Sequence, residues 1–106
     1  MKAIIFLMFI VICANSNAQE VYTNLLVNGK KSTSISAVKV SKLTVESNNK
    51  EYEKFELSGV GCKVTQKEGY WTVLPSSPQV QSIYINVSAK IDGAMRLIFR
   101  NSFNVE

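Results

Sequence analysis

The stretch INVSAKIDGAMRLIFRNSFNVE, residues 85–106, decides the fold of this 106-residue chain. Apolar and polar residues alternate on both sides of an Asp-Gly pair, which is the pattern of two half-buried strands joined by a tight turn. The apolar positions are Ile83, Ile85, Val87 and Ala89 before the turn, and Met95, Leu97 and Phe99 after it. Because all of them carry odd numbers, the stretch predicts a β-hairpin whose two arms share one buried face.

The register of this hairpin depends on the length of its loop. A two-residue turn at residues 92–93 would place Leu97 on the opposite face from Val87. A three-residue loop at residues 91–93 instead pairs Val87 with Leu97 and keeps the apolar positions of both arms together. It also places Gly93 at the last loop position, where a left-handed residue forms a bulge. We therefore predict the three-residue loop.

Shorter alternating runs recur through the rest of the chain, at the spacing of about eight to twelve residues that is typical of β-sandwiches and barrels. Turn residues separate them: Asn28-Gly29 predicts a tight type I′ turn, glycines at 59 and 61 permit a change of direction, and Pro75 ends a strand. The pattern predicts an all-β fold of about seven to eight strands in a single small antiparallel β-sandwich, immunoglobulin-like in architecture.

The N-terminal segment differs in composition from the rest. A single lysine is followed by an apolar run, residues 3–14, which is shorter than the ~20 residues that a spanning helix needs. A basic start, an apolar middle and small residues before the cut are typical of a signal peptide. We expect residues 1–18 to be removed and residues 19–106 to form an exported domain, periplasmic, secreted or on the cell surface, without membrane insertion. A lipid anchor at Cys13 and a retained membrane anchor are the alternatives.

The cysteines and the distribution of charge narrow the class of protein further. After cleavage only Cys62 remains, so an internal disulfide is excluded and Trp71 lacks the cysteine pair of antibody-type domains. Cys62 alternates with polar neighbours, which favours a small buried hydrophobe over the alternative, a reactive thiol. The 12 basic and 8 acidic residues of the chain are scattered, whereas a nucleic-acid surface needs a basic stripe. We therefore expect no nucleic-acid partner.

The sequence offers little for catalysis. With no histidine, a Ser-His-Asp triad, a Cys-His pair and the usual zinc sets are excluded. Asp92 is the only aspartate and belongs to a turn, while Glu51, Glu53 and Glu56 alternate with lysines and lack the spacing of a calcium loop. We predict no enzymatic activity, no metal and no cofactor. An enzyme built on Ser, Lys and Glu is the weakest alternative.

Aromatic residues are the better candidates for binding. Tyr70 and Trp71 are adjacent, so on a strand they point to opposite faces. The structural interpretation is that Trp71 fills the core beside Val73 while Tyr70 caps the rim. Tyr52 and Tyr84 are out of phase with the core positions of their own strands, and an exposed aromatic patch would mark an interface. The candidate partner-binding residues are therefore Tyr52, Tyr70, Trp71 and Tyr84, with strand addition to the terminal hairpin as a further route.

Residues 37–106 also carry a family resemblance. The succession AVKVSKLTVESNNKEYEKFELSGVG, GYWTVLPS, INVSAKIDG and SFNVE resembles the C-terminal β domains of GldM, an envelope protein of gliding motility and type IX secretion. The matching positions are Lys42 to Val45, Leu57 to Gly59, Trp71 to Pro75, Ser88 to Gly93, and Phe103 to Val105. These are signatures of strands and turns. The resemblance implies a bacterial β domain of the envelope and transfers no catalytic residue.

This chain departs from the pattern of that family. GldM-like proteins are expected to carry a membrane helix and several tandem domains, whereas here one domain follows a cleavable signal. We therefore expect a stand-alone, non-enzymatic protein-interaction module, associated with the secretion or gliding machinery, whose partner is an envelope protein or a second copy of the chain. The alternative is an exported carbohydrate-binding or surface-adhesion module that uses exposed aromatics.

Overall fold

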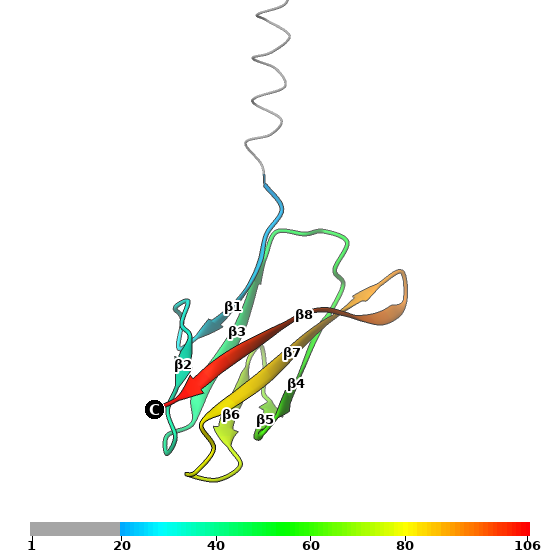
Figure 1. Cartoon of the computed structure of the whole chain (residues 1–106). Helices are drawn as coiled ribbons and strands as arrows, with labels where there is room; N and C mark the ends of the chain where they lie inside the picture. Colours follow the sequence, from blue (N-terminus) through cyan, green and yellow to red (C-terminus); the bar gives the residue numbers. More distant parts are fainter. Residues whose placement is uncertain (1–19) are drawn as a thin grey trace, which may run out of the picture.

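The structure, a computed structural model, describes residues 20–106, which form eight β-strands in two four-stranded sheets (Figure 1). The strands are β1 (Thr23–Val27), β2 (Ser34–Ile35), β3 (Ser41–Ser47), β4 (Phe55–Val60), β5 (Cys62–Gln66), β6 (Trp71–Pro75), β7 (Ser82–Ile91) and β8 (Ala94–Val105). The all-β prediction and the number of strands are confirmed. The expected signal peptide, residues 1–18, and the alternative anchor at Cys13 lie outside the described residues.

The two sheets have the strand orders β1-β3-β6-β5, named sheet A, and β2-β8-β7-β4, named sheet B. Every pair is antiparallel except β2 with β8, where Ser34 lies opposite Asn104 and Ile35 opposite Val105. The prediction of a purely antiparallel fold is therefore wrong at this pair. After β1 the chain leaves the edge of sheet A and crosses to the edge of sheet B. There β2 runs in the same direction as β8, which makes this pair parallel.

The core lies between the two sheets and takes side chains from both. Its buried members are Leu25, Val27, Leu43 and Val73 from sheet A, and Ile35, Ile83, Ile85, Val87 and Phe103 from sheet B. On β7 the odd-numbered residues face inward without a break, as the alternation predicted. Each large aliphatic side chain that becomes fully buried contributes about 1.5–3 kcal/mol, so β7 is the main source of core stability in sheet B.

The terminal hairpin differs from its predicted register. Its turn has two residues, Asp92 and Gly93, with φ of 51° and 83°, so Ile91 lies opposite Ala94. The predicted three-residue loop is wrong. An Asp-Gly pair in which both residues have positive φ fits a type I′ turn, whose twist matches that of the strands. The same geometry occurs at Asn28 and Gly29, where the predicted turn is confirmed.

A bulge in β8 restores the inward face that the short turn would have lost. Ser88 lies opposite Leu97 but Val87 lies opposite Phe99, so Ile98 is the extra residue. From Phe99 onward β8 therefore faces the core in phase with β7. Between the turn and the bulge, Leu97 faces solvent on the outer side of sheet B and is 60% exposed.

Among residues 20–106 there is no helix of the length and apolar character needed to cross a membrane.

Candidate functional site

Tyr84 lies on the outer face of sheet B, on the side of β7 that points away from the core, and is 42% exposed. Val60 of β4, which is 50% exposed, and Ser102 of β8 lie directly opposite it on the two neighbouring strands. The even-numbered positions of β7 point outward because its odd-numbered positions fill the core. Tyr84 is thus held in an open, partly apolar row that crosses three strands.

The next row along the same face is polar and hydrogen-bonded. Asn86 lies opposite Ser58 on one side and Arg100 on the other. Arg100 Nε donates to Asn86 Oδ1 at 2.6 Å, and Asn86 Nδ2 donates to Ser58 Oγ at 3.4 Å. The Arg100 guanidinium also lies over the Tyr84 ring, with Cζ 5.5 Å from the ring centroid, within the range of a cation–π contact. Arg100 is therefore oriented by two neighbours.

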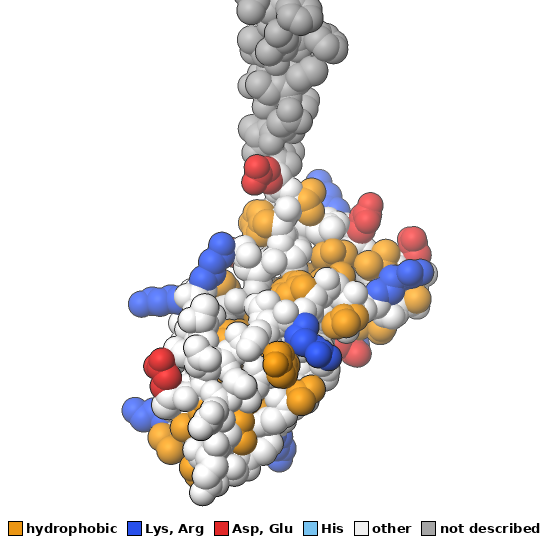
Figure 2. Space-filling model, viewed as in Figure 1, with side chains coloured by type: hydrophobic (Ala, Val, Ile, Leu, Met, Phe, Trp, Pro, Cys, Tyr) orange, Lys and Arg blue, Asp and Glu red, His pale blue; other side chains and the backbone are white. Residues whose placement is uncertain are grey.

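Two more apolar side chains extend this face towards the hairpin turn. Leu97 and Met95 lie opposite Ser88 and Lys90, on the same outer side as Tyr84, and both are exposed. We name the outer-face patch by its members: Val60, Tyr84, Met95, Leu97 and Arg100. Figure 2 shows apolar side chains beside basic ones over the middle of β7 and β8. Such a mixture on an exposed sheet face can contact another macromolecule through both apolar and charged groups.

The other three predicted residues lie away from this patch. Tyr70, Trp71 and Phe55 line a small pocket of about 210 Å³ on the side where β6 begins. Tyr52 packs edge-on against Phe55, with ring centroids 5.7 Å apart and an interplanar angle of 82°. Phe55 lies opposite Ala89, at the far end of β4 from the Val60–Tyr84 pair. The four aromatic residues therefore do not form one surface.

Tyr70 and Trp71 are both half-buried, for different reasons. Trp71 pairs with Leu43 on β3 and packs against the core cluster that contains Val73. The Tyr70 ring lies under the ammonium group of Lys42, with Nζ 4.7 Å from the ring centroid. This is the arrangement in which Trp71 completes the core and Tyr70 caps its rim.

Cys62 lies at the start of β5 and is half-buried against the core. Burial raises the pKa of its thiol above the ordinary value, because the thiolate would lose hydration. Since the thiolate is the reactive form, this environment disfavours nucleophilic chemistry and favours a packing role. Within residues 20–106, no three His, Cys, Asp or Glu side chains gather in a way that would hold a metal ion.

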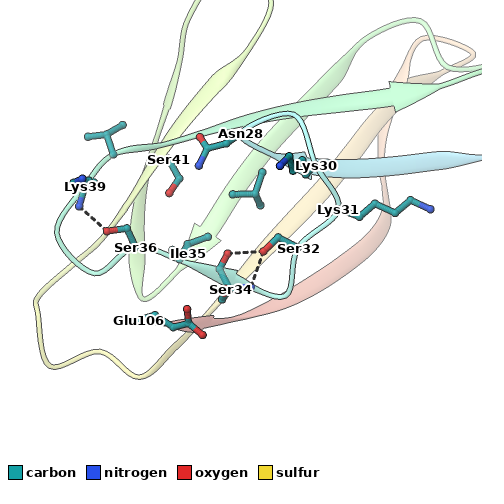
Figure 3. Close-up of a pocket in the computed structure, with 12 residues that line it drawn as sticks. Asn28, Lys30, Lys31, Ser32, Ser34, Ile35, Ser36, Lys39, Ser41 and Glu106 are labelled. Atoms are coloured by element: carbon teal, nitrogen blue, oxygen red, sulfur yellow. Dashed lines mark hydrogen bonds between the residues drawn. The ribbon is translucent and has the colours of Figure 1, made fainter.

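A further pocket among the described residues was not expected from the sequence. It has a volume of about 580 Å³ and lies where the edge strands β1 and β2 approach each other (Figure 3). Its lining consists of Val27, Asn28, Lys30, Lys31, Ser32, Ser34, Ile35, Ser36, Lys39, Val40, Ser41 and Glu106. We name it the lysine pocket. The available signal was three lysines and four serines between residues 30 and 41, a polar composition that by itself indicates only a connection between strands.

Comparison with known proteins adds no family and no relative. No protein-family model matches the chain, and neither a curated protein nor a solved structure is significantly similar to it. The resemblance to the GldM domains stays a prediction from the sequence.

Proposed function

We propose that the protein is an exported, non-enzymatic protein-interaction module of the bacterial envelope, and that its partner binds the outer-face patch. The observation that carries this proposal is the pairing of exposed apolar side chains with an oriented arginine across three adjacent strands. Tyrosine and arginine are enriched among the residues that dominate binding energy at protein interfaces. An arginine already held by Asn86 and Tyr84 loses less conformational freedom when a partner binds.

The open edge of β8 supports the same proposal. β8 pairs with β7 from Ala94 to Asn104, except at the bulged Ile98, but β2 covers its other edge only at Asn104 and Val105. In the described part of the chain, no strand pairs with residues 94–103 on that side. An extended segment of a partner can add to such an edge through main-chain hydrogen bonds. Its side chains would then lie beside Leu97 and Arg100.

Charge favours a partner with acidic side chains over a second copy of the chain. β8 carries Arg96 and Arg100 and no acidic residue between Ala94 and Val105. If two copies paired antiparallel about the middle of β8, Arg100 of one copy would lie beside Arg100 of the other on the outer face. Like charges on paired strands are destabilising, whereas an acidic strand would be attracted.

We also propose that the fold is an immunoglobulin-like sandwich. In constant-type immunoglobulin domains one sheet has the order A-B-E-D and the other C-F-G. The order β1-β3-β6-β5 follows the first, and β4-β7-β8 follows the second with β2 added beside β8. Together with the resemblance of residues 37–106 to GldM domains, this order supports a role in the envelope secretion or gliding machinery. The carbohydrate-binding alternative is supported less, because Tyr84 lies apart from Tyr70 and Trp71.

The test is affinity capture from the envelope of the producing organism, with the protein expressed with its own N-terminal segment and purified after export. The Arg100→Ala and Tyr84→Ala variants should lose the envelope protein that the natural chain retains. Lys63→Ala, an exposed strand cation on sheet A, is the matched control and should retain it. Capture that is unchanged in both patch variants contradicts the assignment of the site. Binding to surface glycans without a protein partner would favour the adhesion alternative.

A further inference from the structure

The lysine pocket has the size and position of a small-molecule site. Its volume of about 580 Å³ falls within the range of roughly 300–1,000 Å³ in which small-ligand pockets occur. It lies between the edges of the two sheets, bounded by the connection before β2, by the connection from β2 to β3, and by the first residue of β3 (Figure 3). Its lining shares no residue with the outer-face patch, so a ligand bound there is independent of the proposed function.

The floor of the pocket holds a buried hydroxyl group. Ser41 is 2% exposed and is the only buried polar residue among residues 20–106. Figure 3 shows its Oγ directed into the pocket, and no hydrogen bond to it is found within the described residues. No fully enclosed side-chain polar atom of these residues lacks a partner, so the hydroxyl is open to the pocket. A ligand or water in the pocket can therefore exchange a hydrogen bond with the Ser41 hydroxyl, which both donates and accepts.

Hydrogen bonds around the floor leave donors directed at the same space. Ser36 Oγ accepts the backbone N–H groups of Val38, at 3.2 Å, and of Lys39, at 2.9 Å, which leaves its hydroxyl hydrogen free to donate. Asn28 Oδ1 accepts the backbone N–H of Lys42 at 2.9 Å, which fixes the amide so that its NH₂ group remains a donor. Together with the Ser41 hydroxyl, these groups give the pocket several hydrogen-bond donors.

The charge of the pocket lining favours the same kind of ligand as these donors do, namely an anion. Three lysines and one glutamate line the pocket. In Figure 3, Lys30 and Lys39 lie on either side of Ser41, while Lys31 extends away and Glu106 lies on the side opposite Ser41. Val27, Ile35 and Val40 form an apolar part of the wall. Ammonium groups and hydroxyl donors bind oxyanions, and an apolar wall accepts a short hydrocarbon body.

We propose that the lysine pocket binds a small molecule that carries a phosphate or carboxylate head on a short apolar body. The head accepts hydrogen bonds from Ser41, Ser36 and Asn28 and is neutralised by Lys30 and Lys39. The body lies against Ile35 and the valines. Glu106 disfavours long polyanions because a second negative group would approach its carboxylate.

The test is a titration of the ¹⁵N-labelled exported protein, followed by two-dimensional NMR at constant ionic strength. The probes are hexanoate, hexyl phosphate and inorganic phosphate, with hexan-1-ol and sodium chloride as controls. We expect saturable shifts of the Ser36, Lys39 and Ser41 amides with hexanoate or hexyl phosphate, and weaker shifts with inorganic phosphate. The stronger of the two hexyl probes identifies whether the natural head is a carboxylate or a phosphate.

Variants separate this site from general charge screening. The double variant Lys30→Ala/Lys39→Ala should weaken hexyl-probe binding by about tenfold or more, since charge-assisted hydrogen bonds are lost. The matched control, Lys63→Ala/Lys67→Ala, removes two exposed lysines elsewhere and should leave the affinity unchanged. Ser41→Ala should also weaken binding while the spectrum remains that of a folded protein. Absence of saturation, equal binding of hexan-1-ol, or equal loss in both double variants would overturn the proposal.

Discussion

The two halves of β8 make opposite use of the same apolar pattern. From Phe99 to Phe103 the strand faces the core opposite Val87 and Ile83, whereas Met95 and Leu97 face solvent. One extra residue, the bulged Ile98, separates the two halves. An alternating run therefore specifies a strand but not which of its stretches is buried. A change of phase can turn a sequence that resembles core into a contact surface.

The largest expected effect comes from truncating one apolar side chain in each half. Phe103 is 1% exposed, so Phe103→Ala should lower the free energy of unfolding by about 3–5 kcal/mol, the cost of a large cavity. Leu97→Ala should lower the free energy of unfolding by less than about 1 kcal/mol, because the Leu97 side chain buries little apolar surface when the protein folds. Urea denaturation of both variants measures the difference. Similar losses in the two would show that Leu97 is buried as well.

Removing the phase change itself is the second test. Deletion of Ile98 would let Leu97 and Phe99 follow Ser88 and Val87 in an uninterrupted ladder. We expect a folded protein that is about 1–2 kcal/mol less stable, because the partial packing of Ile98 against the core is lost. Cross-strand NMR contacts between Lys90 and Met95 should persist. A new pairing of Ala89 with Met95 would instead indicate the three-residue loop.

The turn offers a smaller effect that distinguishes the two registers. A type I′ turn needs positive φ at both central residues, and Asp92 has φ of 51°. Asp92→Ala should therefore lower the free energy of unfolding by about 1 kcal/mol, the strain of alanine in the left-handed region. Asp92→Asn is the control and should be nearly neutral, since asparagine adopts this conformation readily. If alanine is tolerated as well as asparagine, Asp92 does not have positive φ in solution.

The smallest expected effect concerns the contact between Tyr84 and Arg100 on the outer face of sheet B. A double-mutant cycle of Tyr84→Ala and Arg100→Ala should give a coupling free energy of about 0.5 kcal/mol, typical of an exposed cation–π contact. Both variants should remain folded, because neither side chain belongs to the core. Zero coupling in thermal or urea unfolding would mean that the Arg100 side chain is not held over the Tyr84 ring in solution.

Local signals in the sequence were enough for the class of fold but not for the pairing of its strands. The alternation on β7 and the Asn28-Gly29 turn depend on neighbouring residues and were predicted correctly. The position of the bulge cannot be located in the continuous apolar run Leu97 to Phe99, because any of these three residues could face inward. β2 contributes two residues, too few for alternation to set its direction or its partner.

The candidate sites show the same limit of local signals. Tyr84 lies on the outer face, as its phase on β7 predicted. Arg100 was missed because its contact with Asn86 exists only in the true register, and the predicted register placed other residues opposite Asn86. The lysine pocket brings together connections on both sides of β2, and their proximity depends on the crossing between sheets, which no local pattern encodes.

The parallel pair of β2 with β8 has a consequence for the order of folding. Ser34 and Ile35 lie near the start of the described chain, yet their only strand partners within it are Asn104 and Val105. During synthesis, β1 can meet β3 long before β2 can take its place, since β2 must wait until residue 105 has emerged. Pairing between residues so distant in sequence is slow to form. In a nascent chain that stalls before β8, β2 therefore has no strand to pair with. The lysine pocket, which β2 lines, is completed only in the final step of folding.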